Sequence, residues 1–239
     1  MLNCVWLRFY FTLHLVSFTF CGFSNYLNTL SRRVSLSRFL VLCPTTSNNP
    51  PLPTLPYSLH TMPTDKTFTF VPLGAILKDF KVSSQNLVLN FSDPKEYIHN
   101  PCYFGATIGR VANRIADASF TLNGTKYQLA RNNEPCALHG GIVGWDRREW
   151  VHVSSEAVEL SGGKVGGWRD VFSLTSEDGE EGYPGRVKCV LKYTQWREKW
   201  VGAVGGERDV LEMEFEAGLV EEKGEESVEE TVMNLTNHT

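Results

Sequence analysis

The chain has 239 residues, of which 42% are hydrophobic and 21% charged, and its formal net charge is -4. This composition is typical of a globular protein and leaves room for one sizeable domain or two small ones. The small negative charge and the lack of a basic stripe exclude the electrostatic footprint of a nucleic-acid-binding protein, so no nucleic-acid partner is expected.

The first 61 residues differ in character from the rest. Residues 5–23 are apolar and aromatic, and residues 45–56 are rich in Ser, Asn and Pro. Three interpretations are open: a signal peptide or anchor, an organelle-targeting peptide, or sequence upstream of the natural start. We favour the last, because Met62 lies just ahead of patterned sequence. The sequence thus predicts a disordered or targeting leader over residues 1–61 and a domain over residues 62–239.

The cysteines indicate the compartment. Three of the six, Cys102, Cys136 and Cys189, lie in the predicted domain, widely spaced and without a CxxC pair. This pattern predicts reduced thiols in a cytoplasmic protein, and it supports neither a zinc site nor a redox motif. The alternative, a secreted or membrane-anchored form, requires residues 5–23 to act as a signal or anchor; otherwise no membrane partner is expected.

From residue 67 onward the apolar residues recur with period two, which predicts β-strands. Residues 120–129 predict a hairpin, with the turn at Asn123-Gly124, a dipeptide that tolerates positive φ. Residues 186–193 and 210–217 alternate between apolar and charged side chains, which predicts half-buried strands whose charged side faces water. Residues 161–167, 176–185 and 221–226 predict loops. No fixed-period repeat or long amphipathic helix is present, so the pattern predicts an all-β protein, a β-sandwich.

Three polar clusters are candidates for a binding site: residues 109–114, 138–141 and 234–238. Each combines Arg, Asn or His with small residues, which suits directional hydrogen bonds to a neutral polyol. Arg110 and Arg114 are expected to share a face, unless one of them forms a salt bridge. His139 is a site candidate or an ordinary loop histidine, whereas His152 alternates with valines and is expected to be structural.

Two aromatic residues near turns, Trp145 and Tyr183, are either platforms for a sugar ring or packing residues, and packing is the commoner use. The His-Gly-Gly sequence also occurs in oxyanion holes of lipase-like hydrolases. Those enzymes need a Gly-x-Ser-x-Gly turn, which the sequence lacks, so serine hydrolysis is excluded.

Taken together, the motifs resemble the galactose mutarotase branch of the aldose 1-epimerase family. The resemblance runs from about residue 67 to residue 239 and is carried by four motifs: residues 103–105 through 109–115, then 138–141, 178–185 and 234–238. Four ordered motifs are far more specific than one. The resemblance implies a large antiparallel β-sandwich, a small aldose such as galactose or glucose as substrate, and neither a metal nor another cofactor.

The resemblance also implies residue roles. His238 corresponds to the general acid that protonates the ring oxygen, His139 assists at the same oxygen, and Asn113 and Arg114 bind sugar hydroxyls. The family's general base is a glutamate downstream of the motif that ends at His238. We therefore expect the sandwich to lack its later strands and its base, and this chain to be unstable or inactive alone. The alternative function is a non-catalytic carbohydrate-binding relative.

Overall fold

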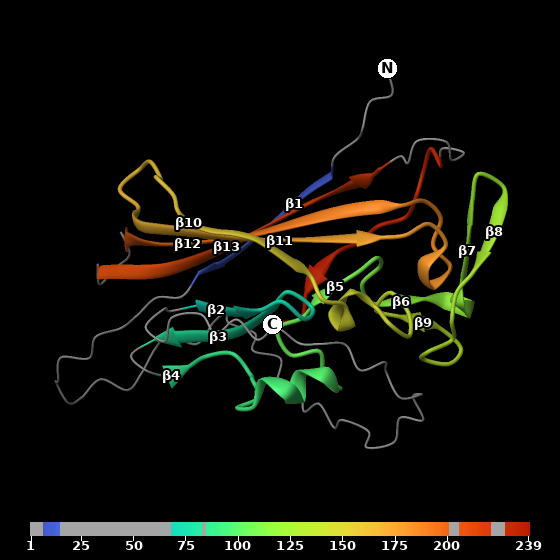
Figure 1. Ribbon diagram of the computed structural model, residues 1–239, viewed down its shortest axis with the longest axis horizontal. Helices are drawn as coiled ribbons and strands as arrows, with labels where there is room; N and C mark the ends of the chain where they lie inside the picture. The colour runs from blue at the N-terminus through green and yellow to red at the C-terminus, as the bar shows by residue number, and fades with distance from the viewer. Residues whose placement is uncertain (1–6, 15–67, 83–84, 201–205, 221–227) are drawn as a thin grey trace, which may run out of the picture. The chain divides into compact units, whose positions relative to one another are not determined.

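The computed structural model describes residues 7–14, 68–82, 85–200, 206–220 and 228–239 (Figure 1). Nearly all regular elements among them are strands, and every strand pair is antiparallel. The all-β, antiparallel prediction is confirmed. The strands are β1 (Leu7–His14), β2 (Phe68–Val71), β3 (Ile76–Val82), β4 (Gln85–Asn86), β5 (Thr107–Ile108), β6 (Arg114–Ile115), β7 (Ser119–Leu122), β8 (Thr125–Gln128), β9 (Ala137–Leu138), β10 (Val151–Ala157), β11 (Val165–Ser176), β12 (Val187–Trp200), β13 (Gly206–Leu219) and β14 (Thr236–Asn237). Short 3-10 turns lie at Pro94–Ile98, Ala116–Ala118, Trp145–Arg147 and Glu180–Gly182.

The main sheet has the order β1-β13-β12-β11-β10 (Figure 1). Its centre is the hairpin of β12 and β13, whose apolar residues alternate with charged ones, as predicted. The apolar side is buried: Cys189, Leu191 and Tyr193 on β12 and Leu211 and Phe215 on β13 are each 0% exposed. Both strands are longer than the alternating segments predicted them to be, because pairing continues from Trp196 and Val210 to Trp200 and Gly206.

The charged side of this hairpin carries ion pairs. Lys192 Nζ lies 2.9 Å from a carboxylate oxygen of Glu216 and 3.7 Å from one of Glu214, across the strand pair. These side chains are half-buried, so the prediction that the charged side faces water holds only in part. Such pairs contribute at most about 1 kcal/mol each.

The strand β1 pairs with β13 along its whole length, from Leu7 opposite Ala217 to His14 opposite Val210. It belongs to the segment predicted as a leader, most of which lies outside the described residues, so the proposed boundary at residue 62 stays a prediction. Of the helices in the described part of the chain, none is long and apolar enough to span a membrane.

A second layer, the small sheet β2-β3-β4, covers the apolar side of the main sheet (Figure 1). Phe70 on β2 stacks on Tyr193 with ring centroids 4.2 Å apart and meets Phe172 edge-on at 6.1 Å. The buried Tyr193 hydroxyl donates to the carbonyl of Ala75 at 2.7 Å, so its polar atom is paired. Two sheets sharing one apolar core make a sandwich.

Two local predictions had different outcomes. The hairpin is confirmed: β7 and β8 join through Asn123 (φ 50°) and Gly124 (φ 79°). The loop predicted over residues 161–167 is wrong in its second half, because β11 begins at Val165. The register shifts between Val165 and Trp168, where two glycines form a bulge that keeps the strand going.

Arg110 ties the short strands to the main sheet. Its side chain is 1% exposed, and its guanidinium donates to Ser176 Oγ (2.9 Å) and to the carbonyls of Ser176 (3.0 Å), Glu177 (2.6 Å) and Pro184 (2.9 Å). Burial lowers the pKa of Arg110 to about 10, so it stays charged at neutral pH. The turn over residues 176–185 is thereby fastened to the segment that begins at Gly109.

We predict that Arg110→Met lowers the free energy of unfolding by about 3 kcal/mol, because several buried acceptors lose their donors while the apolar stem is kept. Urea denaturation followed by tryptophan fluorescence measures this. The matched control is Arg197→Met, whose side chain is 53% exposed and pairs with Asp209 on the surface. Equal denaturation midpoints for the two variants would contradict the anchoring role.

Candidate active site

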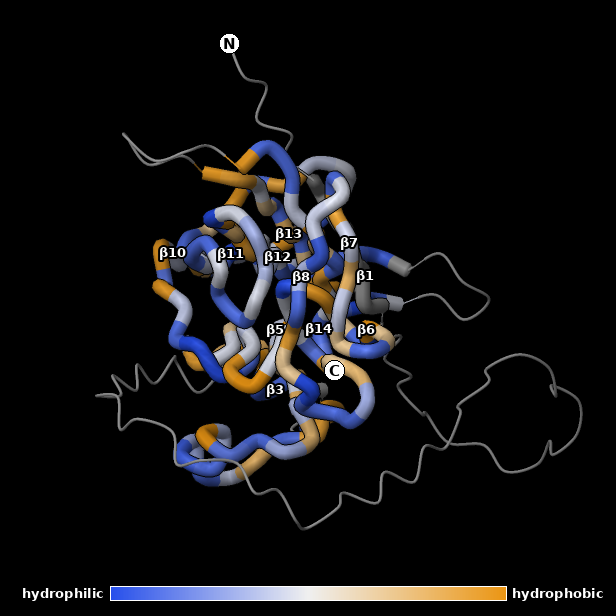
Figure 2. The backbone as a smooth tube through the Cα atoms, turned by 90° about the vertical axis from the view of Figure 1, so that its right-hand side faces the viewer, coloured by the Kyte–Doolittle hydropathy of each residue, from blue (hydrophilic) through white to orange (hydrophobic). Residues whose placement is uncertain are grey.

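The C-terminal cluster is held against residues 105–112 by backbone hydrogen bonds. Thr236 and Asn237 (β14) pair with Ile108 and Thr107 (β5). The N–H of His238 donates to the carbonyl of Ala106 at 2.8 Å, and the N–H of Gly105 donates to the carbonyl of His238 at 3.0 Å. Figure 2 shows β5, β14 and the C-terminus close together. This pairing fixes the backbone from which the His238 ring projects.

The second histidine is fixed by a reciprocal pair of hydrogen bonds. The N–H of His139 donates to the carbonyl of Asn113 at 3.1 Å, and the N–H of Asn113 donates to Nδ1 of His139, also at 3.1 Å. Both residues are left-handed, with φ of 62° for Asn113 and 52° for His139. Asn tolerates this region well, whereas for His139 it costs about 1 kcal/mol, which the surrounding hydrogen bonds offset.

The two imidazoles and one tyrosine form a cluster. The ring centroids of His139 and His238 are 5.5 Å apart, and the Tyr103 ring lies 4.8 Å from the first and 5.6 Å from the second. Tyr103 was not among the predicted site residues. The sequence signal that could have found it is its place at the start of the Tyr103-Phe104-Gly105 motif. In the structure Tyr103 has a positive φ of 58°, which is uncommon for a non-glycine residue.

Arg114 completes the cluster. Its Nε donates to Asn133 Oδ1 at 2.8 Å, and its Nη1 lies 3.4 Å from Asn113 Oδ1. Arg114 is exposed, and its guanidinium has five N–H donors, more than these two contacts use. The structure thus brings together all four predicted residues, Asn113, Arg114, His139 and His238; their roles stay predictions.

The expectation that Arg110 and Arg114 share a face is wrong. Arg110 is buried and Arg114 is exposed. The physical reason is the left-handed backbone of Asn113, which turns the chain between them, so the even spacing of an extended strand does not apply.

The electrostatics of the cluster favour a neutral His139. Burial, the nearby His238 and Arg114 together lower the pKa of His139 to about 4. Its Nδ1 accepts the Asn113 N–H, so the proton of the neutral ring resides on Nε2. At neutral pH, His139 is therefore uncharged and can donate one hydrogen bond from Nε2.

Two residues considered as sugar platforms are packing residues instead. Trp145 and Tyr183 are each 2% exposed. Trp145 meets Trp150 edge-on at 5.8 Å, and Tyr183 stacks on Phe120 at 6.0 Å. His152 is also structural, as predicted: it stacks on Phe172 at 4.8 Å, and its Nε2 lies 3.3 Å from Asp170 Oδ1.

Comparison with known proteins decides the family. The family model described as aldose 1-epimerase matches residues 59–239. The chain belongs to the aldose 1-epimerase family. Over 164 residues, or 68% of this chain, it is 40% identical to a galactose mutarotase from Sus scrofa and 37% identical to one from Homo sapiens. Those residues make up 39% of each relative, so the chain spans about two fifths of the length of the curated relatives it matches.

A solved structure supports the fold. The crystal structure of galactose 1-epimerase from Lactobacillus acidophilus NCFM superposes with a TM-score of 0.54 at 21% identity, covering 72% of this chain and 44% of that one. The β-sandwich inferred from the sequence is therefore the fold of the family. Among the residues that the model describes, no group of three His, Cys, Asp or Glu side chains is arranged to hold a metal ion.

Next to the site, Asp146 is 5% exposed, and burial raises its pKa to about 6, although Arg147 lies 3.6 Å away. Its pKa is thus shifted in the direction opposite to that of His139. Folding raises the pKa of Asp146 from 3.8 to about 6. The contribution of protonated Asp146 to the free energy of unfolding is therefore complete below pH 3.8 and is lost as the pH rises to about 6. Folding lowers the pKa of His139 from 6.5, so its effect is complete above that pH and is lost as the pH falls to about 4.

We predict that these two effects oppose each other between about pH 4 and about pH 6, where the two windows overlap. In Asp146→Asn only the histidine effect remains, so the free energy of unfolding of this variant rises with pH more steeply than that of the unmodified chain. In His139→Gln only the aspartate effect remains, and the slope changes in the other direction. Urea midpoints across this range measure both slopes, and parallel curves for all three proteins would contradict the assignment.

Proposed function

We propose that this protein binds a small aldose such as galactose or glucose at Asn113, Arg114, His139 and His238, and interconverts its α and β anomers in the cytosol. The observation that carries the proposal is the pair of imidazoles 5.5 Å apart, with Asn113 bonded to one ring and Arg114 beside it. Amide, guanidinium and imidazole groups together supply donors and acceptors that suit the hydroxyls of a neutral polyol.

In the proposed reaction, a base removes the proton from the anomeric hydroxyl while an acid protonates the ring oxygen. The C1–O5 bond breaks, and the lone pair left on the anomeric oxygen forms the aldehyde C=O bond. Rotation about C1–C2 and the reverse proton transfers close the ring as the other anomer. The sugar exchanges only protons with the enzyme, so one acid and one base are sufficient to balance the reaction. His238 is the proposed acid, and the Nε2–H of the neutral His139 donates a hydrogen bond near the same ring oxygen.

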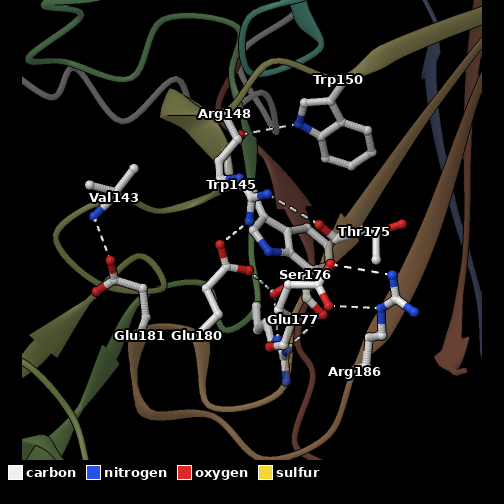
Figure 3. A network of polar contacts seen from close by, with 11 residues as sticks. Val143, Trp145, Arg148, Trp150, Thr175, Ser176, Glu177, Glu180, Glu181 and Arg186 are labelled. Carbon is white, nitrogen blue, oxygen red and sulfur yellow. Dashed lines mark hydrogen bonds and ion pairs between the residues drawn. The ribbon is translucent and has the colours of Figure 1, made fainter. Parts of the chain in front are cut away.

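We propose that neither glutamate of the Asp178-Gly179-Glu180-Glu181 motif is the base. Glu180 binds Arg148 and the hydroxyl of Ser176 (Figure 3). Glu181 accepts the backbone N–H groups of Ile142 at 2.8 Å and Val143 at 3.0 Å. The oxygens of both carboxylates are thus already engaged by groups of the protein itself. This supports the expectation that the family's base glutamate is a residue other than these.

The test is polarimetry of α-galactose and α-glucose anomerisation, with galactose binding followed by NMR in parallel. Three proteins are compared: this chain, a form extended to the full length of the relatives, and the extended form with His238→Ala. We expect the extended form to be active and His238→Ala to lower kcat by about 100-fold or more.

Each outcome decides one part of the proposal. Activity of this chain alone would show that the base lies within its 239 residues. An extended form that binds galactose without converting it would overturn the catalytic role and favour a carbohydrate-binding relative. If neither form binds galactose or glucose, the sugar site itself is refuted.

A further inference from the structure

The turn that presents His139 is held from outside the site by a carboxylate. The two oxygens of Glu181 each accept one backbone N–H, Ile142 at 2.8 Å on Oε2 and Val143 at 3.0 Å on Oε1. These are consecutive residues, so their N–H groups form a small concave anion site that is filled by a side chain of the protein itself. Figure 3 shows the Glu181 carboxylate directed at Val143, while the neighbouring Glu180 points to Arg148.

The packing around this carboxylate is specific. Gly141 has φ of 128°, and a Cβ at this position would collide with the Glu181 carboxylate and with its side-chain carbons. A Cβ at Gly140 would collide with the backbone of Gly109. The two glycines after His139 are therefore required by close approach on both sides, one to Gly109 and one to Glu181.

A second side chain holds the other end of the same turn. Asn132 accepts the N–H of Leu138 at 2.7 Å and donates to the carbonyls of Leu138 at 2.8 Å and Gly141 at 2.7 Å. Asn132 therefore binds one end of residues 138–143 and Glu181 binds the other end, with His139 between them. We call these two sets of hydrogen bonds the clamps. The left-handed backbone of His139 is unfavourable in isolation, and these clamps maintain it.

Glu181 is itself anchored. It has φ of 52° and lies in the turn whose carbonyls at Ser176, Glu177 and Pro184 accept hydrogen bonds from the buried guanidinium of Arg110. Arg110 is three residues before Asn113, the residue that binds His139 Nδ1. The same short segment therefore positions His139 twice, directly through Asn113 and indirectly through the turn that carries Glu181.

We propose that Glu181 is a positioning residue for His139, acting through the N–H groups of Ile142 and Val143 and not through contact with the sugar. This inference rests on the proposed function, because it assigns to Glu181 the orientation of a side chain of the sugar site. Without both acceptor oxygens the turn relaxes, and the His139 ring loses its alignment with His238 and Asn113.

The variant that tests this is Glu181→Gln, which keeps the size of the side chain but places an NH2 group against one of the two N–H donors. The matched control is Glu177→Gln, which removes the same charge from the same turn at a side chain 60% exposed. Three measurements are made on each full chain: amide hydrogen exchange of Ile142 and Val143, the NMR titration of the His139 Hε1 resonance, and galactose affinity.

In Glu181→Gln we expect faster exchange of the two amides, galactose affinity reduced about tenfold, and a His139 pKa that rises from about 4 towards 6.5 as the ring becomes less buried. The His152 Hε1 resonance, from the main sheet, is expected to stay in place. In Glu177→Gln none of these quantities changes. If Glu181→Gln does not fold, Glu181→Asp, which keeps the charge but is one methylene shorter, is expected to show the same changes to a smaller extent.

Failure of this inference and failure of the proposed function give different results. If the unmodified chain binds galactose and Glu181→Gln binds it equally well with an unchanged His139 titration, the positioning role is wrong and the sugar site stands. If the exchange rates and the His139 titration change as expected but the unmodified chain and its extended form bind no aldose, Glu181 positions His139 in a site with another function.

Discussion

The buried guanidinium of Arg110 is the contact on which the arrangement of the site depends. Burying an ion is unfavourable unless its hydrogen-bond donors are satisfied, and here four acceptors from the 176–185 turn satisfy them. Two of those acceptors belong to Ser176, the last residue of β11. The short segments form two small apolar clusters of their own, one around Tyr97 and Ile108 and one around Leu129 and Tyr183. Arg110 adds the polar contact that joins these segments to the end of β11.

A series of hydrogen bonds, rather than regular secondary structure, connects this contact to the histidines. The turn held by Arg110 presents Glu181, Glu181 holds Ile142 and Val143, and these follow the His139 turn. On the other side, β14 brings His238 to within 5.5 Å of His139. Left-handed backbone at Tyr103 and His139 shows that these two residues are fixed by their surroundings and not by local preference.

The sequence predicts the regular parts of this fold better than the irregular ones. Alternation identified β12 and β13, and the Asn123-Gly124 pair identified the hairpin, because both signals are local. The strands β5, β6, β9 and β14 have two residues each and exist only because distant segments pair. No local pattern encodes such pairing. The spacing of Arg110 and Arg114 failed for another reason, the left-handed turn at Asn113 between them. The glycines of residues 162–167 concealed the start of β11, since a bulge and a loop have the same composition.

The four predicted site residues came from motifs and do lie together, whereas Tyr103, Asn132 and Glu181 were not recognised as part of their surroundings. Glu181 is instructive because an acidic turn normally indicates a solvated surface, and only the paired N–H groups opposite distinguish it. The geometry also explains why two histidines in contact need not repel each other. His139 accepts the Asn113 N–H on its Nδ1 and resists protonation, so it carries no charge at neutral pH. The neutral state of His139 thus follows from burial, and its tautomer from one backbone hydrogen bond, before any substrate is considered.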